Sequence, residues 1–574
     1  MRWSCAALLA IGTIVWWTGS EDHGLPTADL HADAPYYYVY LPSLMHGDLD
    51  FSDEYRETHN WYQFGKAPTG HAANPFGIGP AIFDIPLFTI GHGLAYVTGS
   101  RTDGFSKWEV RLYTWSSLLF SIGAIVIAYR LARRRLGTTA LSLVGPVACL
   151  LAGPVVYYAV RQPGYAHPMA TFFAAWFVER WDASYDEVPR RLKTWVTLGA
   201  LLGAAALARP QLALWGVLLV GPAIDDVRVA RGALRPGGRT APIGDAWPQV
   251  ILRWLAGAAA AFVVFAPQFV AWKVVYGEWY LVPQGADFMR WDQPCWSEVL
   301  FSSRNGLFPW APAYAVFAVG LLALVRKQPR LVLFLVLGIA LQAIANGAVW
   351  DWWAGGSFGG RRFDSTYIAF AFGAAAIVAW VARVVPPAFR RDSVVRTRAR
   401  AAAAMLVAFV VLELCVANLR LVARTTTTTA RIYGGEPASV VFKRLDSMHG
   451  RIAAWMSALS NLPARAAFAW EHDVSLADYD HLVGVHVLGE VYPGLNSFAD
   501  TKSAIVPPPP EGHGRVLVAL NRRGSIDVTV VGATRVRWNG TEVPAHFRTD
   551  DLRRGINDLD VEGNVTQPIR IEVP

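Results

Sequence analysis

The chain has 574 residues, of which 53% are hydrophobic and only 17% are charged, and its mean hydropathy is +0.28. An ordinary soluble domain carries about 25% charged residues, so this composition excludes a typical soluble enzyme. The 24 Trp, 20 Tyr and 28 Phe residues exclude a disordered chain. Because several apolar runs approach the roughly 20 residues that cross a bilayer, the sequence predicts a polytopic membrane protein.

The formal net charge of +8 does not indicate nucleic-acid binding, because of where the charge lies. Arg residues cluster in short loops between apolar runs, as the positive-inside rule describes for cytoplasmic loops. We therefore expect a lipid bilayer as a partner and no nucleic acid. The four Cys residues form neither a disulfide framework nor a metal-binding spacing.

Apolar runs define the predicted spans. The first run, Cys5 to Trp17, ends in two Trp residues and is interpreted as a retained span with the N-terminus in the cytoplasm. The segment 75–98 contains several Pro and Gly residues, and we interpret it as a broken helix that is re-entrant or lies on the surface. This choice places five Arg-rich loops on the inner side and predicts about eleven spans with the C-terminus outside. The other runs fall at about 110–129, 139–160, 168–181, 194–208, 210–224, 250–271, 307–325, 331–349, 364–385 and 401–423.

The residues after 423 have a different composition. We expect a mainly α transmembrane domain over 1–423, with a long first outer loop at about 19–109, and a small extracytoplasmic domain over 424–574. Within this tail, 437–461 has helical character, and short alternating segments follow the polyproline run 507–510. Asn539-Gly540 is a hairpin turn signal. The tail is therefore predicted to be a β-rich, sandwich-like or α/β domain.

The first outer loop carries Asp33 beside a group of aromatic residues. A carboxylate in a partly dry cleft beyond a span can serve as a general base. Tyr37 and Tyr38 could stack on a sugar or lie at the level of lipid headgroups. The alternative, with equal weight, is an interfacial aromatic belt beside a solvated Asp33.

Further along the same loop four acidic residues follow closely. They could bind acceptor hydroxyl groups or a divalent cation, as a second acidic site. A solvated acidic loop is the commoner arrangement for each residue. These residues are Asp48, Asp50, Asp53 and Glu54.

The loop 351–363 combines four Gly residues with Trp352, Trp353, Arg361 and Arg362. Backbone amides in a Gly-rich loop can approach a ligand closely, and paired Arg residues are suited to phosphate. The alternative is a tight turn with Arg side chains that reach the interface. An Arg pair on the outer side opposes the positive-inside trend, which favours a functional role.

Three more residues near the predicted outer surface are candidates. Arg304 begins a span, and Arg209 interrupts two apolar runs, which makes each a candidate for a functional role. His167 is a secondary candidate near the acceptor site, because a lone His is more often structural. The alternative for Arg209 is an Arg at a hairpin tip whose side chain reaches the interface.

Taken in order, these motifs resemble the bacterial membrane glycosyltransferases of the GT-C fold, which use polyprenyl-phosphate sugars. The resemblance covers about residues 1–400. The residues that carry it are Asp33 to Tyr38, Leu41 to Phe51, Asn74 to Pro80, His167, Ala-Arg209-Pro-Gln, the run from Leu300 to Trp310 and the run from Trp352 to Arg362.

The resemblance implies a polyprenyl-phosphate sugar donor and an extracytoplasmic acceptor, which could be an envelope glycan, a lipid or a protein. It also implies that Asp33 is the base and that Arg209, Arg304, Arg361 and Arg362 stabilise the leaving phosphate. No cofactor is assigned, and a divalent cation remains an option. Two alternatives stay open: a transporter or flippase for a lipid-linked sugar, and a scaffold without enzyme activity that binds glycan.

Overall fold

A computed structural model of the chain describes two compact units. The first comprises residues 1–288, 311–345 and 361–427, and the second comprises 289–310, 346–360 and 428–574. The predicted boundary near 423 lies close to the last of these segments, but the second unit also includes two stretches from the predicted transmembrane domain. The described residues are 10, 13, 30, 32–58, 64–137, 140–231, 246–285, 288–354, 358–389, 395–425, 436–482, 503–509, 511–520 and 524–574.

Some predictions concern residues outside this described part of the chain. They are the first span from Cys5 to Trp17, apart from two isolated positions, and residues 355–357 of the Gly-rich loop. Arg235, Arg239, Arg390 and Arg391 of the predicted inner loops also lie outside it.

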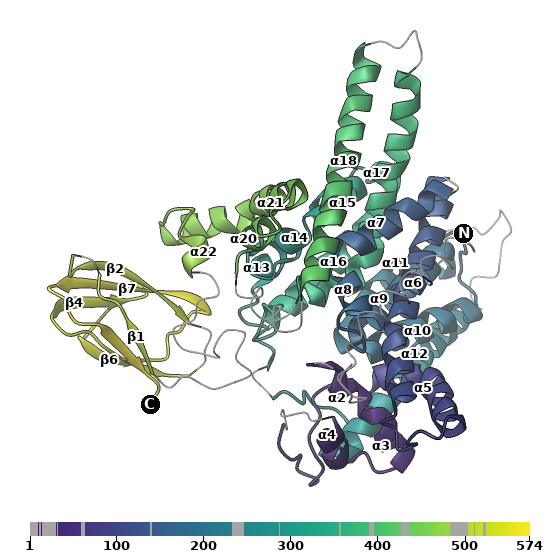
Figure 1. Ribbon diagram of the computed structural model, residues 1–574, viewed down its shortest axis with the longest axis horizontal. Coiled ribbons are helices and arrows are strands. Elements are labelled where there is room, and N and C mark those ends of the chain that lie inside the picture. The colour runs from purple at the N-terminus through teal and green to yellow at the C-terminus, as the bar shows by residue number, and fades with distance from the viewer. Residues whose placement is uncertain are drawn as a thin grey trace. The chain divides into compact units, whose positions relative to one another are not determined.

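The first unit is helical, as the apolar runs predict. Figure 1 shows α17 and α18 as an antiparallel pair that extends beyond the neighbouring helices. Its elements are α2 (Ala34–Tyr38), α3 (Tyr40–His46), α4 (Ser52–Glu57), α5 (Gly79–Val97), α6 (Lys107–Leu136), η2 (Ala140–Leu143), α7 (Val144–Ala152), α8 (Val155–Val160), α9 (Ala166–Ala183), α10 (Leu192–Ala208), η3 (Pro210–Leu219), α11 (Val220–Ala230), α12 (Ala246–Tyr276), α15 (Pro312–Leu322), α16 (Pro329–Ala348), η7 (Arg361–Thr366), α17 (Tyr367–Ala388) and α18 (Val395–Arg424).

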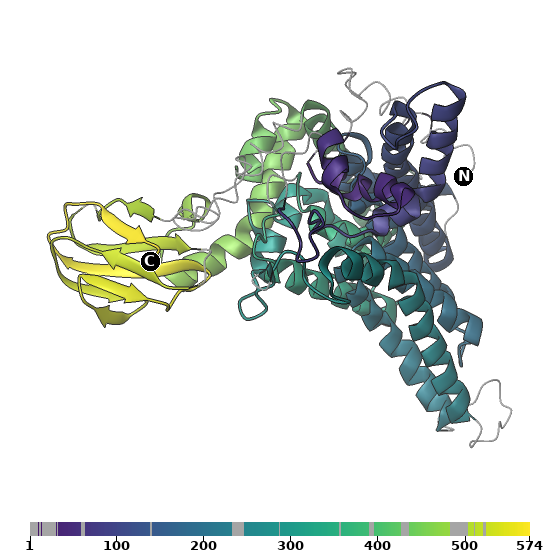
Figure 2. The same cartoon turned by 90° about the horizontal axis from the view of Figure 1, so that it is seen from below.

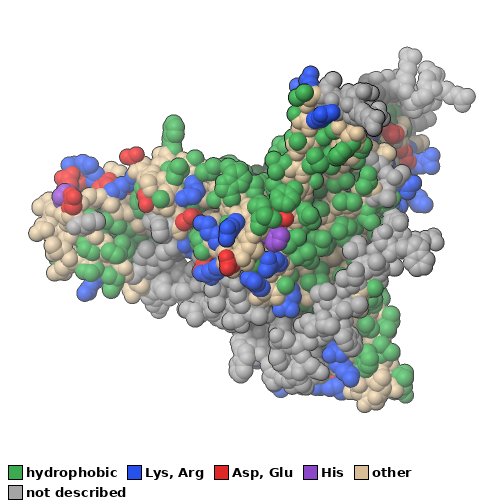
Figure 3. Space-filling view, turned by 45° about the horizontal axis from the view of Figure 1, so that its top comes forward, with side chains coloured by type: hydrophobic (Ala, Val, Ile, Leu, Met, Phe, Trp, Pro, Cys, Tyr) green, Lys and Arg blue, Asp and Glu red, His purple; other side chains and the backbone are tan. Residues whose placement is uncertain are grey.

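Long apolar helices confirm a mainly helical, multi-pass membrane protein. Among the described residues, six helices are long and apolar enough to cross a bilayer. Hydrophobic side chains cover the visible side of the α17–α18 pair, with Lys and Arg near its tip (Figure 3). The six segments are Gly79–Val97, Lys107–Leu136, Trp247–Tyr276, Pro329–Ala348, Arg361–Ala388 and Val395–Arg424, and the shorter apolar helices cover Leu141–Ala152, Leu192–Ala208 and Pro312–Leu322.

Charged residues from the predicted inner loops meet at one end of the helices. The guanidinium groups of Arg135 and Arg330 lie over the ring of Tyr185, 5.0 and 4.9 Å from its centroid. Arg330 Nη1 is 2.7 Å from Asp225 Oδ2, and Arg190 Nη1 is 3.8 Å from the same oxygen. Residues from three of the predicted inner loops therefore lie together. The side of the membrane remains a prediction.

The segment 75–98 is not the broken helix that its composition suggested. Helix α5 is continuous, with Pro86 in its interior. It runs antiparallel to the N-terminal half of α6, where Ser116 donates to Asp84 (3.0 Å) and a Cβ on Gly91 would come 2.8 Å from the Cα of Glu109. This pairing places α5 along the half of α6 that is remote from Arg135. That α5 does not cross the membrane stays a prediction.

The second unit has a helical part built from segments far apart in the sequence. Asn461 Nδ2 of α21 donates to the carbonyl of Phe301 (2.7 Å), and the amide of Ala438 donates to the carbonyl of Ser303 (2.9 Å). The predicted helical stretch 437–461 is confirmed by α20 and α21. The helices are α13 (Trp296–Phe301), α14 (Leu307–Trp310), α20 (Ala438–Lys443), α21 (Met448–His472) and α22 (Tyr479–Leu482).

The rest of the second unit is a β-sandwich, which confirms the predicted β-rich domain. Two antiparallel four-stranded sheets, in the orders β1-β8-β3-β6 and β2-β7-β4-β5, face each other (Figures 1 and 2). Inward-facing side chains such as Val518, Val528 and Trp538 form its core. Asn539 and Gly540 have positive φ angles and connect β4 to β5, as the turn signal predicted. The strands are β1 (Ser503–Val506), β2 (Gly514–Leu520), β3 (Ile526–Thr529), β4 (Ala533–Trp538), β5 (Thr541–Val543), β6 (His546–Thr549), β7 (Gly555–Gly563) and β8 (Ile569–Glu572).

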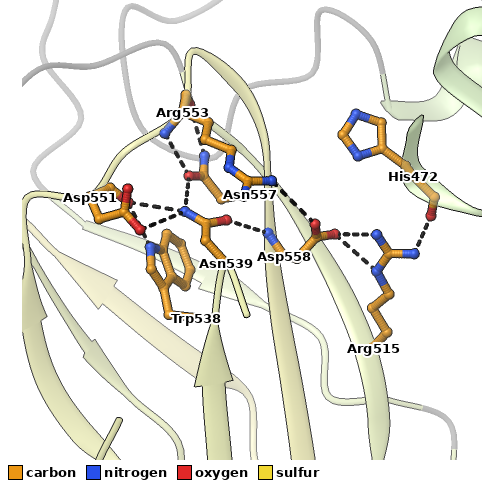
Figure 4. Close-up of polar contacts among 8 residues, drawn as sticks. All are labelled: His472, Arg515, Trp538, Asn539, Asp551, Arg553, Asn557 and Asp558. Carbon is orange, nitrogen blue, oxygen red and sulfur yellow. Dashed lines mark hydrogen bonds and ion pairs between the residues drawn. The ribbon is translucent and has the colours of Figure 1, made fainter. Parts of the chain in front are cut away.

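Arg515 joins the sandwich to helix α21 within this unit. Its guanidinium binds Asp558 of the adjacent strand at 2.6 and 2.9 Å and also donates to the carbonyl of His472 at the end of α21 (Figure 4). Arg553 approaches the other oxygen of Asp558 at 3.7 Å. This side-chain network fixes the end of α21 against the sheet.

Candidate active site

Asp33 lies at the start of the short helix α2, in the first unit. Arg361 Nη1 donates to Asp33 Oδ2 at 2.8 Å, and the two side chains are 16% and 26% exposed, respectively. The backbone N–H of Asp33 donates to the hydroxyl of Tyr165 (3.2 Å), and the guanidinium of Arg361 lies 5.9 Å from the centroid of the Tyr165 ring. The predicted base and a predicted phosphate ligand, which are 328 residues apart, are therefore in direct contact.

Arg209 is held beside His167 at the junction of α10 and η3. Arg209 Nη1 lies 2.9 Å from His167 Nδ1, and the Gln211 amide oxygen, turned toward the guanidinium, accepts from Arg209 Nε and Nη2 at 3.0 and 3.1 Å. Burial lowers the pKa of His167 well below 6.5, and the positive charges of Arg209, Arg361 and Arg362 lower it further, so its ring is neutral. A neutral ring can accept at Nδ1 from Arg209.

Asp364 is a buried carboxylate next to this pair. Its Oδ2 lies 3.2 Å from His167 Nδ1, and its side chain is 1% exposed. Neither carboxylate oxygen has a hydrogen-bond partner among the described residues. Asp364 therefore lies next to His167 without a hydrogen bond from its carboxylate to any described residue.

Positive charge exceeds negative charge in this cluster. Arg209, Arg361 and Arg362 all lie close enough to His167 to affect its titration, whereas the carboxylates nearby are Asp33 and Asp364. Burial lowers the pKa of Arg209, and the like charges of Arg362 and Arg361 lower it further. Three guanidinium groups against two carboxylates form a site suited to an anion with more than one negative charge.

The two Tyr residues predicted to contact sugar or lipid lie in different environments. Tyr37 is partly exposed, and burial raises its pKa to about 12 while Arg209, Asp33 and Arg361 act on it electrostatically, which places it at the site. Tyr38 is fully buried, and its hydroxyl donates to the carbonyl of Gly104. Tyr38 therefore has no exposed surface with which to contact a sugar in this structure.

The four acidic residues of the first loop have separate partners instead of forming one cluster. Asp48 accepts from Ser43 (3.0 Å), and Asp53 pairs with Arg56 at 3.1 Å on the exposed surface. A backbone hydrogen bond from Ala72 lowers the pKa of Asp50, which ties this carboxylate to the loop fold. The fourth residue, Glu54, is buried beside His46.

Arg304, Trp352 and Trp353 belong to the second unit. Arg304 Nη2 donates to the carbonyl of Asp480 (3.1 Å), and the carbonyl of Trp353 accepts from Asn305 Nδ2 (2.8 Å). The Trp352 and Trp353 rings meet edge to face, 5.8 Å apart, and both are buried. In this unit the two Trp residues form part of the core that supports the loop before Arg361.

Sequence reasoning did not assign Tyr165, Gln211 or Asp364 to the site. Gln211 follows the Arg209-Pro pair directly. A polar residue next to an Arg within an apolar run could have indicated that Gln211 belongs to the site. Asp364 is an acidic residue at the start of a predicted span, which by itself indicates function. No sequence pattern indicated a role for Tyr165, because Tyr residues are common near a membrane interface.

A metal site does not form among the described residues, in which no three His, Cys, Asp or Glu side chains are grouped to hold an ion. No cofactor is assigned to this site. The proposed chemistry below uses the side chains of the chain itself.

Comparison with known proteins gives matches only among solved structures. No protein-family model and no curated protein matches the chain. A structure of ArnT from Cupriavidus metallidurans bound to undecaprenyl phosphate is 15% identical, with 81% of this chain and 79% of that chain covered and a TM-score of 0.41. The apo state of the same protein is 14% identical, with coverages of 81% and 78% and a TM-score of 0.38.

An archaeal oligosaccharyltransferase is also similar. The structure of AglB from Archaeoglobus fulgidus with an inhibitory peptide and a dolichol-phosphate is 12% identical, with 87% of this chain and 61% of that chain covered and a TM-score of 0.41.

Proposed function

We propose that the chain is a membrane glycosyltransferase that moves a sugar from a polyprenyl-phosphate donor to a cell-envelope acceptor on the extracytoplasmic side. The observation that carries this proposal is the contact between Asp33 and Arg361 within a cluster that also holds Arg209 and Arg362. A carboxylate that can accept a proton thus lies beside guanidinium groups suited to a phosphate monoester or diester. Transfer from a lipid-linked sugar phosphate requires both.

In the proposed reaction Asp33 accepts the proton of an acceptor hydroxyl. The hydroxyl oxygen bonds to the anomeric carbon of the donor sugar while the bond from that carbon to the phosphate oxygen breaks. The bonding pair leaves with the phosphate, which gains one negative charge and remains on the polyprenyl chain. Arg361, Arg362 and Arg209 stabilise this charge, and fixed donors in a partly dry site contribute several kcal/mol, about 2.7–4 for a single donor in known cases.

In the proposed reaction Arg361 also determines when Asp33 is free to accept a proton. Without a donor it is paired with Asp33, which occupies the carboxylate and neutralises the arginine. A phosphate that binds Arg361 competes with Asp33 for the same donor atoms. Donor binding would therefore release Asp33 to accept a proton, so that the base becomes available when the sugar is in place.

The transporter alternative fits the cluster less well. A pathway for a lipid-linked sugar should place charged residues along the middle of the spans. Here the anion-binding residues come from helix starts and junctions: Asp33 precedes α2, Arg209 lies between α10 and η3, and Arg361 begins η7. This location favours a glycosyltransferase active site over a transport pathway.

The test is the glycan composition of the envelope in a strain that lacks the chain. Complementation with the wild-type chain should restore a missing sugar, and complementation with Asp33→Asn at equal membrane abundance should not. Asp53→Asn removes an exposed carboxylate from the same loop and is the matched control, which should restore the sugar. Full restoration by Asp33→Asn would contradict the assignment of the base. An unchanged envelope in the deletion strain would contradict the proposed activity.

A further inference from the structure

Helix α21 of the second unit has a continuous apolar face that the chain leaves uncovered. Trp455 is 67% exposed and Trp470 is 91% exposed. Met448, Leu459 and Leu462 are exposed on the same helix, at spacings that follow the helical repeat. A helix of 25 residues is about 38 Å long, so this face is long as well as apolar. Figure 3 shows hydrophobic side chains gathered over this part of the second unit.

The opposite face of α21 is the one that the unit buries, and apart from Phe468 it is made mainly of small and polar residues. Ala453, Ser457 and Ala464 are buried, and Asn461 donates to the carbonyl of Phe301 in α13. A soluble helix normally shows the reverse arrangement, with its apolar face in the core. The large side chains of α21 are therefore available to a partner outside this unit.

The chain around α21 indicates that this partner is the membrane surface. Helix α16, which is able to span a bilayer, ends at Ala348, and a Cβ on Gly347 in its last turn would come 2.7 Å from the backbone N of Trp296. Trp296 begins α13, which packs on α21, and its side chain is 53% exposed. The helical part of the second unit therefore packs on the last turn of a helix that is long and apolar enough to span a bilayer. Exposed Trp side chains beside the end of such a helix are typical of a membrane interface.

The charge of this region agrees with a lipid surface. Between residues 438 and 472 the sequence has four basic residues, Lys443, Arg444, Arg451 and Arg465, and two acidic ones. An amphipathic helix with Trp and Leu on one face and a net positive charge binds in the plane of an anionic leaflet.

We propose that α21 lies in the outer leaflet, parallel to the membrane plane, with Trp455, Leu459 and Trp470 in the headgroup and upper acyl region. It would act as a surface anchor that restrains the second unit at the bilayer. This inference is independent of the proposed reaction, because it concerns a helix that contributes no residue to the site around Asp33.

The test uses a spin label on the full chain in nanodiscs of phosphatidylethanolamine and phosphatidylglycerol. Leu459→Cys, with Leu462→Cys as a second position, is labelled in a background without the four native cysteines. Power saturation then compares collisions with oxygen, which concentrates in lipid, and with a water-soluble nickel chelate. The lipid control is Leu333→Cys on α16, and the water control is Ile505→Cys on β1, which are 62% and 71% exposed.

If the proposal is correct, the label on α21 collides more with oxygen than with the nickel chelate, as the label at position 333 does. A label that behaves like the one at position 505 would overturn the proposal, because α21 would then face water. Low collision with both reagents, together with dipolar broadening between labels, would overturn it in favour of contact with a second copy of the chain.

Discussion

The pairing of Asp33 with Arg361 predicts that a substitution of Asp33 changes the affinity for the donor as well as the rate of transfer. If Arg361 must leave Asp33 to bind phosphate, removing the charge of Asp33 removes the competitor. The Asp33→Asn variant should therefore bind a polyprenyl monophosphate more tightly than the wild-type chain while it fails to transfer sugar. Tighter binding with lost activity distinguishes a base that competes for its arginine from one that only accepts a proton.

The size of the effect follows from the geometry of the pair. Arg361 Nη1 and Asp33 Oδ2 are 2.8 Å apart, and the side chains are 16% and 26% exposed. Unit charges about 4 Å apart interact by about 4 kcal/mol at an effective dielectric constant of about 20. Because water reaches both side chains, we expect about 1–2 kcal/mol to be recovered, which corresponds to roughly 5- to 30-fold tighter binding.

The assay is a titration of the purified chain in nanodiscs with a short-chain polyprenyl monophosphate, read by native mass spectrometry. Arg361→Gln should weaken binding, and Asp33→Asn should give no further gain in the Arg361→Gln background. Asp53→Asn, which changes the net charge equally at an exposed position, should leave the Kd within about twofold. The reasoning is refuted if Asp33→Asn binds no more tightly than wild type, or if Asp53→Asn tightens binding as much.

Three further outcomes follow from side-chain environments in the two units and from the predicted topology. Arg554 donates to the carbonyls of residues 293, 347, 349 and 350 at 2.6–3.0 Å and should therefore hold the segment before Arg361. Arg554→Ala should increase the hydrogen exchange of amides 347–353 at least tenfold. Arg535→Ala, which removes an exposed ion pair with Glu542, is the control and should not increase it. Asp364 is buried without a hydrogen-bond partner for its carboxylate among the described residues, so Asp364→Asn, which keeps the size of the side chain, should raise the free energy of unfolding by about 1 kcal/mol; a lower Tm in a thermal melt in detergent would contradict this reasoning. A cysteine at Lys327 should react with an impermeant maleimide only from the cytoplasmic side and one at Glu278 only from outside, and reaction of both from one side would refute the predicted topology.

Composition and local pattern were sufficient to predict the fold class. Apolar runs predict helices because a span must satisfy its own backbone hydrogen bonds, and the Asn539-Gly540 pair predicts a turn because it accepts positive φ angles. The broken helix predicted around Pro86 was wrong. An interior Pro removes one hydrogen bond, and the packing of α5 along α6 is sufficient to keep the helix continuous.

The site was predictable where residue type and context were unusual and not where they were ordinary. Arg361 and Arg362 stood out because an Arg pair in a Gly-rich outer loop opposes the charge rule for membrane proteins. The contact of Arg361 with Asp33 was predicted only as a shared role, since no local pattern specifies a pairing across 328 positions. Tyr165 supports both partners of that pair, yet nothing around it distinguishes it from other interfacial tyrosines.

The discontinuous composition of the second unit imposes an order on biogenesis. Segments 289–310 and 346–360 are made near the middle of synthesis, and each of their partners Ala438, Asn461 and Arg554 follows its contact in these segments by more than a hundred residues. Until the ribosome has completed the β-sandwich, the segment that precedes Arg361 lacks Arg554, which donates to its carbonyl groups and holds it. The nascent chain can therefore complete its apolar helices before this segment is supported, and the proposed activity should appear only once the last domain has folded.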